Sequence, residues 1–313
     1  MEKIRAYKSD KPFFTYAFIA LCVLLYFLIG FLSNFGDVQE DTYKLFGAPY
    51  AVDIYRGHFW GVVFNSLLHV YWYQIVLNLI FVFFFLRAFE IILGPYKLFI
   101  FGLLASTVTS CIQLGLSDDA GIGLAGVNFS LLGFFLVRRN IDQRFNLPWI
   151  YPMAIALFIL FFVMYYLNLK HGWNFGLAAM IGGFAWGALV GLMYFKRTFR
   201  FIAPLVVASN LICFTSIVYA PWSAEWNCAK GIRAHEKKNL VLAKTYYEKT
   251  LVIDHENYLA VKNLQLIRIN EWSDQAYQAH LNGEYSKARM LYQKILIEDP
   301  DNKWAQANLK ELQ

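Results

Sequence analysis

The sequence predicts an all-α protein: a polytopic bundle of membrane helices followed by a helical domain of ordinary polar composition. Hydrophobic residues make up 58% of the chain and aromatic residues 19%, far above the shares in soluble proteins. The apolar residues are gathered in uncharged stretches, each near or above the roughly 20 residues that a helix needs to cross a bilayer. Charged residues return after residue 224. We therefore predict a transmembrane domain over 1–224 and a helical repeat domain over 225–313.

Seven uncharged stretches predict seven membrane-spanning helices. They cover residues 12–36, 57–86, 98–117, 120–137, 145–169, 172–195 and 201–224. The second stretch is longer than one span requires, which predicts a partly embedded loop over 58–69 before its helix.

The basic residues predict how the bundle is oriented. They cluster before the first span, between the fourth and fifth, and between the sixth and seventh: Lys3, Arg5, Lys8, Lys11, Arg138, Arg139, Arg144, Lys196, Arg197 and Arg200. Basic loops stay in the cytoplasm, so the N-terminus is expected there. With an odd number of spans, the domain over 225–313 is expected outside. No cleavable signal sequence is evident.

Several kinds of partner are not expected. The net charge of +6 is explained by the topology, and no nucleic-acid binding is predicted. No CxxC pair or histidine cluster is present, so neither a metal nor another cofactor is expected. Cys228, just after the last span, is either a buried thiol or a thiol that pairs with another chain.

Residues 123–133 read GLAGVNFSLLG and carry the main functional signal. This stretch resembles the fourth span of the rhomboid intramembrane proteases, in which G-x-S-G places a nucleophilic serine at the top of a helix. Here the serine position is Ala125, whose methyl group cannot attack a carbonyl. The glycines of the pattern remain, as Gly123, Gly126 and Gly133.

The sixth span shows the same combination of retained glycines and a replaced polar residue. It resembles the A-H-x-G-G-x-x-x-G pattern of the same family, which supplies the catalytic histidine. Here the histidine position is Met180, while Gly183 and Gly187 remain. Small residues at this spacing let helix backbones approach closely in membranes.

Residues 56–78 are similar to the family's first loop and second span. His69 and Asn78 match the pattern, whereas Gln74 replaces a histidine that, with the asparagine, helps to stabilise the oxyanion. Gln74 and Asn78 share one helix face. With His69 and Asn128 they are the candidate polar groups of a binding cavity. The alternative is that these amides only hold helices together.

The altered positions predict that the chain is not an enzyme. The resemblance implies a pseudoprotease that binds membrane-protein clients within the bilayer. An active intramembrane serine protease with displaced residues is the alternative, with Ser130 as the candidate hydroxyl and His58, His69 and His171 as candidate bases. A third possibility is a scaffold in which the bundle serves only as an anchor.

The domain over 225–313 contains a repeat of 45 residues, in which 243–251 lines up with 288–296. Each unit resembles a tetratricopeptide repeat with either an extra or a lengthened helix. Such repeats form a concave surface that binds a protein or peptide partner; a helical cap that stabilises only itself is the alternative. Because some bacterial rhomboids combine these two domains, we expect a bacterial inner membrane protein.

Overall fold

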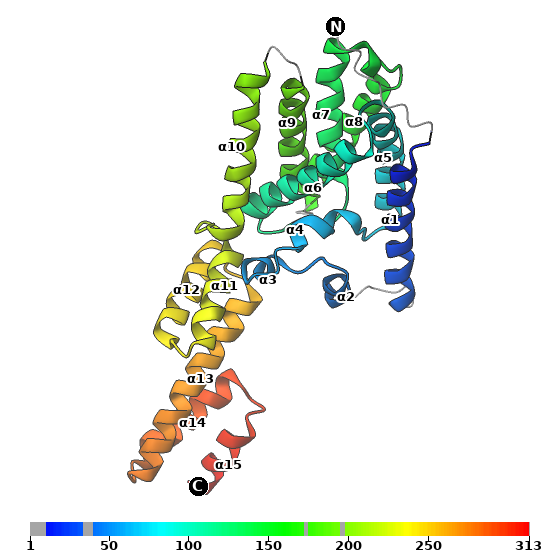
Figure 1. Ribbon diagram of the computed structural model, residues 1–313. Helices are drawn as coiled ribbons and strands as arrows, with labels where there is room; N and C mark the ends of the chain where they lie inside the picture. Colours follow the sequence, from blue (N-terminus) through cyan, green and yellow to red (C-terminus); the bar gives the residue numbers. More distant parts are fainter. Residues whose placement is uncertain (1–10, 34–39, 172–174, 195–197, 313) are drawn as a thin grey trace. The chain divides into compact units, whose positions relative to one another are not determined.

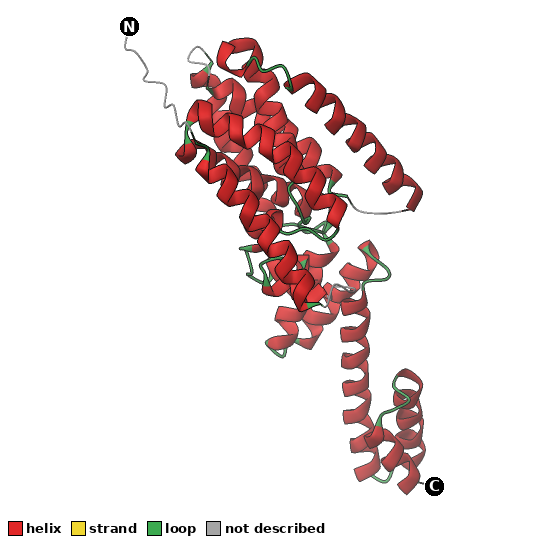
Figure 2. Cartoon of the chain, turned by 90° about the vertical axis from the view of Figure 1, so that its right-hand side faces the viewer, coloured by secondary structure: helices red, strands yellow, loops and turns green. Residues whose placement is uncertain are grey.

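The computed structural model describes residues 11–33, 40–171, 175–194 and 198–312. Within these ranges the chain is helical, and no strand is present (Figure 2). The chain divides into two compact units, the first ending at Ala220 and the second beginning at Pro221.

The first unit contains long apolar helices and a connection of short ones. In chain order they are α1 (Phe13–Leu32), α2 (Glu40–Leu45), α3 (Ala51–Tyr55), α4 (Gly61–Phe64), the 3-10 helix η1 (Asn65–Leu67), α5 (Trp72–Leu93), α6 (Pro95–Ser117), α7 (Ala125–Ile141), the 3-10 helix η2 (Gln143–Phe145), α8 (Ile150–His171), α9 (Leu177–Met193) and α10 (Phe199–Val218) (Figure 1).

The prediction of seven full-length spans is not confirmed. In the described part of the chain, five helices are long and apolar enough to cross a membrane: α1, α5, α6, α8 and α10. The fourth and sixth predicted spans correspond to α7 and α9, which have 17 residues each. At 1.5 Å per residue such a helix is about 25 Å long, short of a hydrocarbon core of about 30 Å. The apolar stretches overestimated these two helices because they include residues outside them, such as 120–124 before α7 and 175–176 before α9.

The short helices α7 and α9 form the centre of the unit and pack along each other (Figure 1). Gly133 lies against the backbone of Phe184, and Gly187 lies against the carbonyl group of Ser130. A Cβ atom at either glycine would overlap these backbone atoms. The glycines found in the sequence are therefore the points at which the two helix backbones meet.

Helix α1 is capped by a residue from another helix. The Glu90 carboxyl group, which is 2% exposed, accepts hydrogen bonds from the Phe14 N–H at 3.0 Å and the Thr15 N–H at 2.8 Å. It also accepts one from the Thr15 hydroxyl at 2.6 Å. The first N–H groups of a helix have no intrahelical acceptor. Glu90 of α5 therefore supplies the hydrogen-bond acceptor for the start of α1.

The second unit consists of α11 (Ala224–Glu236), α12 (Leu240–Ile253), α13 (Tyr258–Leu281), α14 (Tyr285–Glu298) and α15 (Lys303–Glu311). α11 packs on α12, and α13 packs on α14. The 45-residue period is explained by the 24 residues of α13, a lengthened helix rather than an added one. Cys228 is fully buried, as one of the two alternatives for this thiol predicts. That these helix pairs are tetratricopeptide repeats stays a prediction.

Equivalent positions of the two pairs have equivalent backbone geometry. Asn257 and Asn302 each precede a helix, and each side chain accepts a hydrogen bond from the N–H three residues later, at 3.1 Å. Lys238 and Gly283, which are 45 residues apart, are both left-handed, with φ of 59° and 75°. The turn between paired helices therefore needs a left-handed residue, which glycine provides at the lower cost.

Candidate functional site

A cavity of about 610 Å³ opens in the first unit. It lies at the end of the bundle where α5, α7 and α9 begin and α6 and α8 end. Leu157, Leu160 and Met164 of α8 form one apolar wall, and Phe129 of α7 lies beside them. The rest of the lining comes from the starts of α7 and α9 and from residues of α5, α6 and the 118–124 loop, several of them polar.

The three altered positions of the sequence pattern, Ala125, Met180 and Gln74, all line this cavity. Ala125 is the first residue of α7, and Met180 is in the first turn of α9. The N–H groups of Ala125, Gly126 and Val127 precede the first backbone bond of the helix, which Asn128 donates to the Leu124 carbonyl at 2.8 Å. These three groups have no acceptor within α7. The start of α7 therefore brings hydrogen-bond donors to the cavity, although Ala125 brings no hydroxyl.

The loop before α7 is fixed by hydrogen bonds from distant residues. The Gln74 Nε2 donates to the Ile122 carbonyl at 2.7 Å, and the Gly123 N–H donates to the Asn65 carbonyl at 3.0 Å. Gly123 has φ of 110°, a left-handed conformation that other residues rarely adopt. A Cβ atom there would lie 2.6 Å from Gln74 Nε2. This glycine lets the loop pass directly over the amide.

Gln74 and Asn78 line the cavity, but both amides also hold the structure together. Gln74 Oε1 accepts from the Val70 N–H at 2.9 Å, which together with its bond to Ile122 joins the start of α5 to the loop. Asn78 Oδ1 accepts from Asn128 Nδ2 at 3.0 Å. The Asn78 Nδ2 lies 3.5 Å from where a Cβ at Gly123 would stand. Of the two amides, Asn78 is the better placed to donate to a ligand.

Asn128 and His69 do not line the cavity. Asn128 is 0% exposed and lies behind Asn78, to which it donates. His69 is 1% exposed and precedes α5. Both belong to the packed surroundings of the cavity. The predicted candidate groups thus separate into two that line it and two that lie behind the lining.

Three lining side chains had no functional signal in the sequence. Thr109 and Ser110 of α6 and Asp119 of the following loop all face the cavity. Thr109 and Ser110 belong to a group of hydroxyl residues in the third span that are typical of close helix contacts. The sequence therefore offered no reason to assign them a function. The buried Gln113 supports the site from behind, since its Oε1 accepts from the Ala179 N–H at 3.0 Å and so fixes the first turn of α9.

Ser130, the candidate displaced nucleophile, is enclosed between helices. It is 0% exposed, and its hydroxyl donates to the Gly126 carbonyl at 2.9 Å. A Cβ at Gly183 of α9 would lie 2.9 Å from this hydroxyl oxygen. Ser130 does not line the cavity, so a substrate in the cavity does not reach it in this structure.

Comparison with known proteins shows what the part of the chain around this site is similar to. Residues 56–197, which include the residues that line the cavity, match the family model for the rhomboid domain. Over 170 residues the chain is 28% identical to rhomboid protease GlpG of Haemophilus influenzae, covering 54% of this chain and 85% of that protein.

A second relative matches almost the whole chain. Over 309 residues the chain is 24% identical to rhomboid protease GluP of Bacillus subtilis, covering 97% of this chain. The match spans 58% of the length of that protein. The similarity therefore extends beyond the rhomboid domain into the second unit.

These matches correct the prediction that the chain is not an enzyme. That prediction depended on the replaced residues Ala125, Met180 and Gln74. Both relatives are named proteases, so this part of the chain is similar to proteolytic enzymes, and three replaced residues do not exclude an activity.

Proposed function

We propose that the cavity of the rhomboid domain binds a segment of another membrane protein. One observation carries this proposal: within an apolar helix bundle, a cavity of about 610 Å³ is lined by the start of α7 and by amide and hydroxyl side chains. Polar groups inside a membrane are costly, and they tend to face cavities that serve a function. A polypeptide satisfies such groups with its own backbone.

The bound segment needs carbonyl groups that are not already hydrogen-bonded. The N–H groups of Ala125 and Gly126 and the amide of Asn78, all of which belong to lining residues, are donors. A regular helix uses its carbonyls internally, whereas an interrupted or extended segment leaves some of them free. We therefore expect a preference for segments whose helix is interrupted by glycine or proline near the same end of the bilayer.

Entry from the lipid between α5 and α8 is consistent with how loosely α8 packs. Only 17% of the apolar stretch of α8 is buried, although Leu157, Leu160 and Met164 form a wall of the cavity. A small displacement of α8 would open this wall while breaking few contacts.

Photocrosslinking in vesicles tests the binding site. A benzophenone amino acid at Leu160 faces the cavity, whereas one at the neighbouring Ile159, which is 60% exposed, faces outward. A synthetic single-span peptide with a central Gly-Pro step should crosslink at Leu160, and Ala125→Leu should reduce this yield by filling the cavity. Ala185→Leu, on the exposed face of α9, should have no effect. Equal yields at the two benzophenone positions would contradict the proposal.

Serine-type proteolysis within the membrane is the second candidate, favoured by the two relatives that are named proteases. Among the hydroxyl groups, Ser110 and Thr109 line the cavity, and Ser130 does not. A fluorophosphonate probe on the purified protein tests this candidate. Labelling that is lost in Ser110→Ala but kept in Ser130→Ala would support an active site in the cavity; no labelling in any variant would count against serine chemistry.

For the second unit we propose recruitment of a protein or peptide partner. Its helices carry highly exposed apolar side chains, among them Val241, Val252 and Ile297 at 76–79%. Proximity labelling with and without residues 221–313 tests this proposal. If the bundle is only an anchor, deletion should remove every neighbour; if the cavity also binds, membrane-protein neighbours should remain.

A further inference from the structure

The lining of the cavity includes one acidic side chain among its described residues. Among the described residues that line it, Asp119 is the one with a charged side chain. This residue lies in the loop between α6 and α7, just beyond the membrane helices. It therefore faces whatever part of a bound segment lies at the mouth of the cavity.

The local structure orients this carboxylate and limits its contact with water. Its Oδ1 accepts a hydrogen bond from the Gly121 N–H at 3.0 Å, which fixes the side chain relative to the loop. The residue is exposed and lines the cavity. Surrounding protein atoms displace part of its water shell and raise the pKa of the Asp119 carboxyl group, while the bond to Gly121 opposes this rise. A nearby positive charge would stabilise the ionised form.

Two aromatic rings at the same mouth also favour a cation. Tyr71 and Tyr73 stand at the start of α5 and line the cavity. Their rings are stacked, with centroids 5.2 Å apart and planes within 6°. The two residues are 55% and 42% exposed. Aromatic faces attract ammonium and guanidinium groups, and this pair adds an electron-rich surface to the site of the carboxylate.

We propose that the polypeptide segment bound in this cavity carries a lysine or arginine at its end near the cavity mouth, where Asp119 and the Tyr71–Tyr73 pair receive it. This inference rests on the proposed binding of membrane segments and specifies which of them are bound. If the mouth is the outer end of the bundle, the requirement is selective, because basic residues concentrate at the cytoplasmic ends of membrane helices.

Paired peptides test the inference in vesicles containing the full chain. Two single-span peptides with the same Gly-Pro step differ only in one residue at the mouth end, lysine or glutamine. Crosslinking at a benzophenone placed at Leu160 reports binding. The lysine peptide should bind about fivefold more tightly than the glutamine peptide. This gain in affinity lies between those expected from a solvent-exposed ion pair and from one shielded from water. Asp119→Asn should abolish this difference, and Asp119→Lys should reverse it in favour of a glutamate peptide.

A matched control stands one residue away. Asp118 has φ of 52° and is absent from the cavity lining. Asparagine tolerates this left-handed conformation, so Asp118→Asn removes the same charge without distorting the loop. It should leave the preference for lysine unchanged. A preference lost equally in both variants would indicate a general field rather than a site at Asp119, and would overturn the inference.

The possible outcomes distinguish a failure of this inference from a failure of the proposed function on which it rests. If lysine and glutamine peptides crosslink equally well at Leu160 and neither responds to Asp119→Asn, the inference fails while segment binding stands. If neither peptide crosslinks more at Leu160 than at Ile159, the proposed function itself fails, and the inference fails with it.

Discussion

At the scale of single residues, Gly187 sets how closely α7 and α9 approach. Alanine there would place a Cβ atom on the Ser130 carbonyl, and because this is helix backbone it cannot move aside alone. Gly187→Ala should lower the free energy of unfolding by about 3 kcal/mol. Gly102, which has no atom within 4 Å of its Cβ position, is the control. Gly102→Ala should be neutral or stabilise by up to about 1 kcal/mol.

Thermal unfolding in detergent micelles measures both changes. A large drop in the midpoint for Gly187→Ala beside an unchanged midpoint for Gly102→Ala is expected. Similar midpoints for the two variants would show that the close approach of α7 and α9 is not what stabilises the unit.

Lys238 is a second residue with a measurable cost. Its φ of 59° is left-handed and disfavoured for a residue with a Cβ, and the equivalent position of the next helix pair is Gly283. Lys238→Gly should stabilise the turn between α11 and α12 by up to about 1 kcal/mol. Lys237, with φ of −82°, is right-handed, so Lys237→Gly should bring no gain. Hydrogen exchange of the α12 amides in the full chain measures the difference; faster exchange in Lys238→Gly would refute the assignment.

Residue types were easier to predict than residue roles. The glycine patterns placed Gly133 and Gly187 on facing helices, and each of these glycines does lie against the backbone of the other helix. Gln74 lines the cavity, but its amide also donates to the Ile122 carbonyl, 48 residues away in sequence. Such a role depends on where an unrelated loop passes, which local spacing does not encode. The capping of α1 by Glu90 went unpredicted for the same reason.

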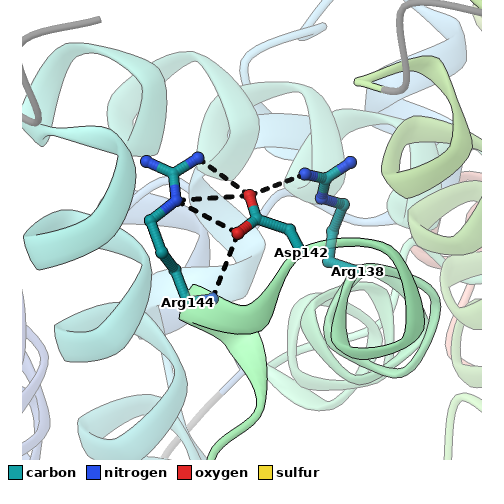
Figure 3. Close-up of polar contacts among 3 residues, drawn as sticks. All are labelled: Arg138, Asp142 and Arg144. Carbon is teal, nitrogen blue, oxygen red and sulfur yellow. Dashed lines mark hydrogen bonds and ion pairs between the residues drawn. The ribbon is translucent and has the colours of Figure 1, made fainter. Parts of the chain in front are cut away.

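At the scale of elements, the end of α7 is closed by a three-residue charge cluster (Figure 3). Asp142 accepts from Arg138 at 2.9 Å and from Arg144 at 2.8 Å. These bonds, those of Arg144 first, lower the pKa of Asp142 to about 2 despite partial burial. A lowered pKa means that the folded state favours the ionised form, so Asp142 stabilises the fold above its unfolded pKa of about 4.

The stabilisation should therefore disappear as the pH falls from about 4 to 2. At neutral pH, Asp142→Asn should cost up to about 2 kcal/mol of stability, the equivalent of the pKa shift. Unfolding midpoints of the parent and the variant, measured from pH 6 to pH 2, should converge at the acid end. A constant gap across that range would show that Asp142 acts by its shape rather than its charge.

Apolar stretches located the long helices well but not the short central ones. Helices α1, α5, α6, α8 and α10 each coincide with a predicted span. The predicted fourth span begins in a loop whose glycines are uncharged but not helical. The predicted sixth span begins at residue 172, outside the described residues, and composition alone does not mark where α7 and α9 start. The 45-residue period located the helix pairs, yet only the structure shows that one long helix accounts for its length.

At the scale of the whole molecule, the short helices raise a question of topology. If α7 crosses the membrane despite its length, Ser117 and Asn146 lie on opposite faces. Single cysteines introduced at these positions should then react with a membrane-impermeant maleimide added from opposite sides of the membrane. Labelling of the parent chain gives the background. The positive-inside pattern predicts that Asn146→Cys reacts from the cytoplasm. Labelling of both variants from one side would exclude a crossing by α7.

The sequence predicted where the site lies but not the full set of residues that line it. The family resemblance brought Ala125, Met180, Gln74 and Asn78 to one end of the bundle, and the cavity is there. Asp119 and Ser110 join them because α6 ends beside the start of α7, a consequence of packing between segments rather than of any motif.

The continuous helix α13 has a mechanical consequence for the second unit. It packs against both α12 and α14 and runs without a loop from Tyr258 to Leu281. Two helix pairs joined by a flexible linker would move independently of each other. Because 24 residues of one helix join them, a displacement of α14 would be transmitted to α11 and α12, the pair that follows the apolar helices in sequence.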